Sequence, residues 1–170
     1  MATTFTLIKT VTVGSGGASS IDFTSIPSTF TDLCLKYSLR TTATAASNGY
    51  YGTYSFNTLT TNISQKAIYG TGSSASSTSS ASILSFMTDA SDYTTSTFSN
   101  GELYIPNYAS SNNKSMSQDA VSENNATAVY TFMYAGLWAA SAAINAIGFT
   151  PAGGTFVQYS TASLYGILKA

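Results

Sequence analysis

A strict alternation of side chains over Asp32–Thr41 constrains the fold more than any other stretch of this sequence. Leucine or tyrosine occupies every second position from Leu33 to Leu39, and mostly polar residues stand between them. A period of two places alternate side chains on opposite faces of a β-strand, so one face of this segment is expected to meet a core. No segment of useful length has the 3.6-residue period of an amphipathic helix. The stretch therefore predicts a β-sheet protein.

Further strand-like runs follow along the chain, rich in β-branched or aromatic residues and bounded by turn residues. We expect strands at 3–13, 20–23, 53–58, 65–69, 101–107, 114–122, 126–138 and 144–150, with a short apolar run at 83–87. The mostly polar segment 114–122 is expected at a sheet edge. The segment 126–138 carries bulk on both faces, so it is expected at a sheet centre or an interface. About eight to ten short strands predict an all-β, jelly-roll-like antiparallel sandwich.

The C-terminal stretch 144–170 contains two strand-like runs joined by a turn. Pro151, Gly153 and Gly154 mark the turn, because proline fixes φ and glycine permits the positive φ of tight turns. A final strand has to be paired, since buried backbone N–H and C=O groups need partners. The second run, Gln158–Ile167, is therefore expected to close a sheet.

The chain is expected to form one domain, 1–170, since sandwiches of 170 residues do not need to divide. Within it, the low-complexity segment GTGSSASSTSSAS at 70–82 predicts a flexible exposed loop. Ordering such a segment costs roughly 1–2 kcal/mol per residue and buries no apolar surface in return.

Charge and targeting features exclude several classes of protein. Only 8% of the residues are charged and the formal net charge is −1, so Ser, Thr, Asn and Gln must form the polar surface. The six basic residues are scattered, which argues against nucleic acid as a partner. No apolar run approaches 18 residues and the first residues lack the pattern of a signal peptide, so we expect no membrane span and synthesis in a cytoplasm.

Nucleophilic and metal chemistry have few candidate residues in this chain. The absence of histidine excludes Ser-His and Cys-His catalysis, and with one cysteine it excludes a zinc site in practice. Cys34 lies in the strand-like segment without a His neighbour, so we expect a buried structural thiol. The glycines at 14, 16 and 17 are followed by neither Lys-Ser/Thr nor a helical pattern, which argues against a phosphate loop.

The carboxylates offer two weak alternatives. Asp89 and Asp92 are candidates for a shared calcium ion, and Asp119 with Glu123 for an acid pair. Calcium needs six to eight oxygen ligands, and the local sequence does not supply them at alternate positions. We favour solvated loop carboxylates, and the sequence assigns no catalytic, cofactor-binding or metal-binding residue. The chain is not expected to be an enzyme.

The aromatic residues have two interpretations. Tyr50, Tyr51, Tyr54 and Trp138 are candidate platforms for stacking on sugars. Packing in the core or at a subunit interface is the favoured alternative.

Three phrases of the sequence carry a family resemblance. They are SIDFTSIPSTFTDLCLKYSLRTT at 20–42, LYIPNYASSNNKSMS at 103–117 and INAIGFTPAGGTFVQYSTASLYGILKA at 144–170. They resemble small virion structural proteins of tailed bacteriophages, especially phages of cyanobacteria and other aquatic bacteria. The phrases cover about two fifths of the chain, and residues 43–100 have no counterpart in the resemblance.

The resemblance implies a β-rich module on the capsid exterior or on a fibre, commonly trimeric, and it carries over no catalytic or binding residue. One hypothesis is a capsid decoration or cement protein, a homotrimer that binds the major capsid protein on the outside of the assembled head. A second is a tail-fibre or head-fibre tip that binds host surface glycans through the aromatic candidates. A third, a polysaccharide depolymerase, lacks the expected solenoid repeats and carboxylate cluster.

Overall fold

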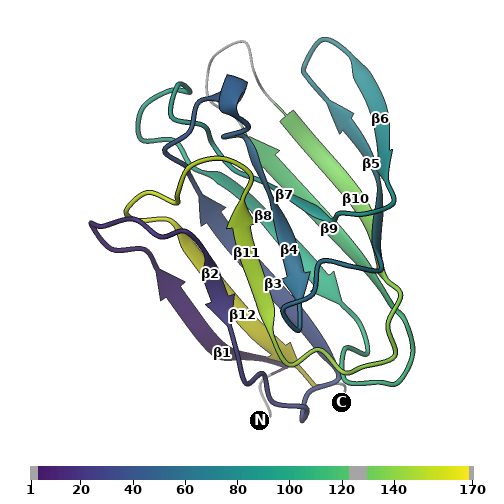
Figure 1. The fold of residues 1–170 in the computed structure, drawn as a ribbon. Coiled ribbons are helices and arrows are strands. Elements are labelled where there is room, and N and C mark those ends of the chain that lie inside the picture. Colours follow the sequence, from purple (N-terminus) through teal and green to yellow (C-terminus); the bar gives the residue numbers. More distant parts are fainter. Residues whose placement is uncertain (1–3, 123–129, 169–170) are drawn as a thin grey trace.

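Two antiparallel β-sheets pack face to face in the computed structural model, which describes residues 4–122 and 130–168 (Figure 1). The strands are β1 (Phe5–Thr12), β2 (Ile21–Phe23), β3 (Asp32–Leu39), β4 (Tyr51–Phe56), β5 (Ile63–Gly70), β6 (Ala75–Ser80), β7 (Ser85–Met87), β8 (Ser99–Ile105), β9 (Lys114–Ser122), β10 (Tyr130–Trp138), β11 (Ile147–Pro151) and β12 (Thr161–Ile167), and a short 3-10 helix, η1, spans Ala45–Ser47. One sheet has eight strands in the order β1-β12-β3-β8-β9-β10-β5-β6, and the other has four in the order β2-β11-β4-β7. The predicted all-β sandwich is confirmed, with twelve strands among the described residues where about eight to ten were expected.

Eight of these strands have the connectivity of a jelly roll. When β5, β6, β9 and β10 are set aside and the others are numbered along the chain, the sheets read 1-8-3-6 and 2-7-4-5. This is the order of a double Greek key. The four remaining strands are two hairpins, β5-β6 inserted after β4 and β9-β10 inserted after β8. Because β10 pairs with β5, the two hairpins extend the larger sheet beyond β8.

The core lies between the four-stranded sheet and the jelly-roll part of the larger sheet. The alternation in β3 is confirmed on this side, where Leu33, Leu35, Tyr37 and Leu39 are all buried. Aromatic rings fill the centre of the layer: the Phe149 ring lies 4.9 Å from the Tyr54 ring and 4.9 Å from the Phe86 ring between centroids, and Phe86 lies 5.1 Å from Tyr54. The three rings come from β4, β7 and β11, so they hold the smaller sheet together as well as joining the layers.

The outer face of β3 is more buried than its polar composition suggests. Asp32 is buried, and hydrogen bonds compensate its carboxylate for the loss of water: it accepts from the Tyr104 hydroxyl at 2.7 Å and from the Asn107 amide at 2.9 Å. Just beyond β3, the buried Arg40 guanidinium donates to the backbone carbonyls of residues 91, 93, 94 and 97 at 2.8–3.1 Å. These bonds replace water for the charge, so Arg40 fixes the loop that follows β7.

The expectation of a flexible loop at 70–82 is wrong. The segment forms the turn and second strand of the β5-β6 hairpin, with Gly72 at φ +81° in the turn and six residue pairs from Gln65↔Ser80 to Gly70↔Ala75. All but the last residue of β6 are exposed, as expected for this composition. The backbone of β5 supplies the hydrogen bonds that order the segment, so little side-chain burial is needed.

Two further expectations concern positions in the larger sheet. Residues 114–122, expected at an edge, form β9 between β8 and β10, so the edge assignment is wrong. Ser115, Ser117 and Asp119 stand on the exposed outer face, whereas the inner face buries polar as well as apolar side chains, namely Lys114, Met116, Gln118, Ala120 and Ser122. The central position expected for 126–138 is confirmed for β10, and residues 126–129 lie outside the described part of the chain.

The C-terminal runs fall into different sheets. β11 lies in the smaller sheet and β12 lies in the larger one, where it pairs with β1 on one side and β3 on the other. The expected pairing of the final strand is confirmed. In the described residues no helix has the length and apolar character needed to cross a membrane.

Removal of residues 164–170 is expected to prevent folding. The deletion takes the second half of β12 from between two strands and removes the fully buried Leu164. Losing a buried leucine costs about 2–5 kcal/mol, and the lost ladder hydrogen bonds add to a total that approaches the whole stability of a domain, about 5–15 kcal/mol. Far-UV circular dichroism and thermal melting test this, with removal of 168–170 alone as the control that keeps the fold. A cooperative melt of the longer truncation would contradict the expectation.

Candidate functional site

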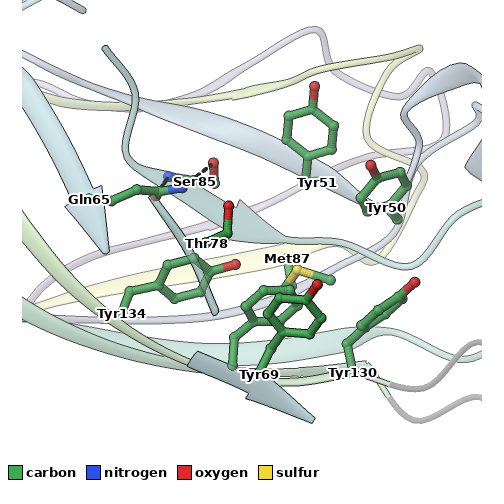
Figure 2. Close-up of a pocket in the computed structure, with 10 residues that line it drawn as sticks. Tyr50, Tyr51, Gln65, Tyr69, Thr78, Ser85, Met87, Tyr130 and Tyr134 are labelled. Carbon is green, nitrogen blue, oxygen red and sulfur yellow. Dashed lines mark hydrogen bonds between the residues drawn. The ribbon is translucent and has the colours of Figure 1, made fainter. Parts of the chain in front are cut away.

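The unequal width of the two sheets creates a step on the inner side of the sandwich. The smaller sheet ends at β7, which packs over β8 and β9. Strands β10, β5 and β6 continue past this edge to one side of it (Figure 1). A cavity of about 290 Å³ lies at the step. It is lined by Tyr50, Tyr51, Gln65, Tyr69, Thr78, Ser85, Met87, Tyr130, Phe132 and Tyr134, and is called the aromatic pocket below (Figure 2).

One wall of the aromatic pocket is a row of rings on the larger sheet. Tyr130, Phe132 and Tyr134 occupy alternate positions of β10 and therefore share its inner face. Tyr69 of β5 stands directly opposite Phe132, with ring centroids 4.9 Å apart and planes inclined by 23°. The Phe132 and Tyr134 rings are 5.0 Å apart and nearly parallel, at 8°. Tyr134 is buried, whereas Tyr69, Tyr130 and Phe132 are half-buried.

The opposite wall is the pair Tyr50 and Tyr51, whose ring centroids lie 5.0 Å apart. The preceding Asn48-Gly49 turn positions them. Asn48 has φ +62°, and a Cβ atom at Gly49 would lie 2.1 Å from a backbone oxygen, so only glycine fits there. The Gly49 carbonyl accepts hydrogen bonds from the hydroxyls of Thr41 at 2.8 Å and Thr88 at 2.6 Å. These bonds fix the backbone immediately before Tyr50.

Polar groups close one end of the pocket. The Ser85 amide donates to Gln65 Oε1 at 2.7 Å, and Gln65 Nε2 donates to the Ser85 hydroxyl at 3.3 Å, as the dashed lines in Figure 2 show. Behind them, Gln118 Nε2 donates to the Ser85 carbonyl at 3.1 Å. The Gln65 amide is thus oriented before any ligand arrives, which lowers the entropic cost of using it for recognition.

The residues that line the pocket in the described part of the chain are aromatic or polar apart from Met87, and they carry no charge. None of its ten lining residues is Lys, Arg, Asp or Glu. Burial raises the pKa of Tyr50, and the neighbouring Tyr51 and Tyr130 add to the rise. Burial also raises the pKa of Tyr134. These phenols are therefore neutral at physiological pH and are able both to donate and to accept hydrogen bonds.

The aromatic candidates from the sequence divide into two groups. Tyr50 and Tyr51 line the pocket, whereas Tyr54 and Trp138 are each 1% exposed and pack in the core. Core packing is thus confirmed for Tyr54 and Trp138. Sequence reasoning missed Tyr69 and the inner face of β10 as parts of a site. The alternation of aromatic residues along β10 was a visible signal, but its pairing with Tyr69 was not.

The carboxylate candidates do not converge on one site. Asp89 is fully buried and accepts a hydrogen bond from the Ser122 hydroxyl at 2.5 Å, so the expectation of a solvated carboxylate is wrong for it. Asp92 is exposed and accepts from the Ala45 amide at 2.8 Å. Residues 4–122 and 130–168 contain no group of three or more His, Cys, Asp or Glu side chains that could hold a metal ion.

The second carboxylate pair is only partly described. Glu123 lies outside the described residues, so its pairing with Asp119 stays a prediction. Asp119 is exposed on the outer face of β9, where it stands opposite Glu102 of β8. Glu102 forms a salt bridge of 2.7 Å with Lys36. This charged group lies on an open sheet surface.

Comparison of the chain with protein-family models, curated proteins and solved structures finds no significant match. Its function is therefore argued from the fold, the aromatic pocket and the surfaces.

Cys34 is expected to resist alkylation in the folded protein. It is fully buried, as predicted, and burial, followed by the charge of Glu102, raises its pKa to about 12. An unfolded cysteine has a pKa of about 8.5, so the reactive thiolate forms readily only after unfolding. Iodoacetamide labelling at about pH 8.5, followed by mass spectrometry, should be slow in buffer and fast in guanidinium. Equal rates in the two solutions would contradict the burial of this thiol.

Proposed function

We propose that this chain is a structural protein of a tailed-bacteriophage virion and decorates the outside of the head as a trimer. The resemblance supports the class of protein, and most strands that its phrases cover belong to the jelly-roll framework. The phrases cover β2, β3, β11 and β12, the end of β8 and the start of the inserted β9. The segment without a counterpart, 43–100, includes the inserted β5-β6 hairpin together with the framework strands β4 and β7.

The observation that carries the decoration role is the outer face of the eight-stranded sheet. Among the described residues, five of the eight exposed large apolar side chains stand on this face, with exposed fractions of 37–61%. They are Phe5 and Leu7 on β1, Ile68 on β5, and Met133 and Leu137 on β10. Phe5 and Leu7 lie on the edge strand β1, on the far side of the sheet from β10 and β5, so the apolar patch that favours an interaction surface is the one around Ile68 and Met133.

The surroundings of these side chains favour contact with a large protein surface. Ile68 and Met133 stand directly opposite each other, and Ser77 lies beside Ile68 on the edge strand β6. All six residues of β6 are Ser, Thr or Ala, so this edge lacks the charges and prolines that usually prevent edge-to-edge pairing. Charged groups also stand on this face: Lys66 lies beside Ile68, and the Lys36–Glu102 salt bridge lies on β3 and β8. A partner that covers the face would have to pair with these charges, because leaving them buried and unpaired is costly.

The proposed mechanism is mass action on the assembled shell. A protein that binds only the assembled state stabilises it by RT ln(1 + [L]/Kd) per site, and a head offers many sites. A trimer matches the local threefold points of an icosahedral lattice. Three linked contacts also raise the overall affinity without strong single contacts.

The aromatic pocket favours a second candidate, a fibre module that binds host surface glycans. Seven of its ten lining residues lie within 43–100, the segment outside the resemblance, and three lie on β10. Six of the ten lie on the inserted hairpins, and placing recognition residues on segments added to a rigid framework is a common arrangement in binding proteins.

Substitution of the outer face tests the decoration role. The double variant Ile68→Lys, Met133→Lys is expected to lower affinity for expanded empty heads about tenfold or more, because it places two charges in a contact that excludes water. Co-sedimentation with heads measures the binding. Leu59→Lys is the matched control, since Leu59 is 50% exposed but lies in the β4–β5 connection. Equal binding by the double variant and the control would place the contact elsewhere.

Copy number and oligomeric state separate the two candidates. Quantitative mass spectrometry of virions is expected to find hundreds of copies per particle, and sedimentation equilibrium is expected to find a trimer. A few to a few dozen copies, or wild-type protein that does not bind heads but is retained on host lipopolysaccharide, would reject decoration in favour of the fibre role.

A further inference from the structure

We propose that the aromatic pocket binds one neutral pyranose ring of a glycan and discriminates against acidic sugars. This inference rests on the glycan-binding candidate above and names the ligand chemistry of that site. It does not depend on whether the module stands on a head or on a fibre.

Aromatic residues line the space that a sugar would occupy from two sides, although the Tyr51 ring points away from the larger sheet. Tyr69, Tyr130 and Phe132 on the larger sheet are half-buried, so part of each ring is accessible, and Tyr50 and Tyr51 stand on the opposite side (Figure 2). A pyranose has an apolar face of C–H groups and a rim of hydroxyls. Aromatic rings with phenol tips offer the matching surface, apolar on the face and polar at the end.

Polar groups are available where the hydroxyl rim would lie. Gln65 and Ser85 close one end of the pocket, and Thr78 of β6 lines it as an exposed side chain. Gln65 is held in place by its two hydrogen bonds to Ser85. A fixed amide is able both to donate to and to accept from sugar hydroxyls, so the site has directional groups at one end and apolar rings along its length.

The absence of charge in the lining decides between classes of sugar. A carboxylate or phosphate entering the pocket would lose hydration and find no Lys or Arg among the ten lining residues. The same argument excludes a nucleotide, whose base would stack but whose phosphate would lack a cation. Neutral hydroxyls lose less hydration on entry and regain hydrogen bonds from the amide and the phenols.

The size of the pocket limits the ligand. Its volume of about 290 Å³ is at the lower end of the range for small-molecule sites, about 300–1,000 Å³. This space suits one ring, with the rest of the glycan extending into solvent. So few contacts give a Kd in the millimolar range, and display of many copies on one virion would compensate for the weak single contact.

Matched pairs of sugars test the charge discrimination. Methyl glycosides of glucose, galactose, mannose and N-acetylglucosamine are titrated into ¹⁵N-labelled protein, each hexose against the uronic acid that differs from it by one carboxylate. We expect at least one neutral sugar to shift amide signals of the aromatic pocket, and its acidic counterpart to bind at least about tenfold more weakly.

Substitutions of the pocket test the location. Tyr69→Ala is expected to lower the affinity about tenfold or more, and Tyr69→Phe to keep it within about threefold because the ring remains. Tyr159→Ala is the matched control, a tyrosine that is 68% exposed and outside the pocket. Tyr50→Ala removes part of the other wall and serves as the test variant if Tyr69→Ala does not fold.

The outcomes separate this inference from the function on which it rests. Equal or tighter binding of the acidic sugar overturns the inference. A proline-rich peptide, which also stacks on aromatic rings, is titrated in parallel, and tighter binding of this peptide than of any sugar overturns the inference too. In either case binding to host cells still tests glycan adhesion. Adhesion to host cells without binding of any neutral sugar also overturns the inference. If neither sugars nor host cells are bound, both the inference and the glycan-binding candidate fail.

Discussion

The pairing of β10 with β5 is the interaction on which the rest of this structure depends. It joins two hairpins that are inserted at separate points of the jelly roll, and it extends over eight residue pairs from Thr131↔Gly70 to Trp138↔Ile63. Without it the larger sheet would end at β10, and the β5-β6 hairpin would not belong to it. With it the larger sheet has twice as many strands as its partner, and part of its inner face has no second sheet above it. Such a face is either covered by loops or left open to solvent and to ligands.

Both arrangements occur on the inner face of β10, one at each end of the strand. At its C-terminal end, Trp138 is buried under Phe56, at 5.6 Å between ring centroids, and under the ammonium of Lys114, 5.7 Å from its ring. The Lys114 ammonium donates to the carbonyls of residues 110, 112 and 142 at 2.6–2.7 Å, so it draws two loops over this end. Burial lowers its pKa, and the carbonyl oxygens replace water around the charge. At the other end the described residues make no comparable closure over Tyr130 and Phe132, and the aromatic pocket lies there.

The parts of this structure that were predictable from sequence are those that side-chain patterns determine. The period of two in β3 and β10 correctly predicted that both segments are strands. It also correctly predicted which side chains share a face. The strand β6 was not predictable, because backbone pairing with β5 holds it in place and its Ser/Thr sequence has no side-chain pattern that indicates this pairing. The central position of β9 depends on which strands become its neighbours, and a polar outer face resembles an edge when seen alone. Tyr51 and Tyr54 were grouped as equivalent candidates, but their spacing of three on β4 places them on opposite faces, so one lines the pocket and the other packs in the core.

The two proposed surfaces occupy opposite faces of the same strands. Ile68 and Met133 stand on the outer face, and their chain neighbours Tyr69 and Phe132 stand on the inner one. A shift of the β5–β10 register by one residue would exchange the two sets, so the sheet can support both surfaces only while the register is fixed. The buried Tyr134 and Trp138 fix it, because a slip would move both from the interior to solvent. Attachment through the outer face therefore leaves the aromatic pocket accessible, and assembly and ligand binding are compatible in one module.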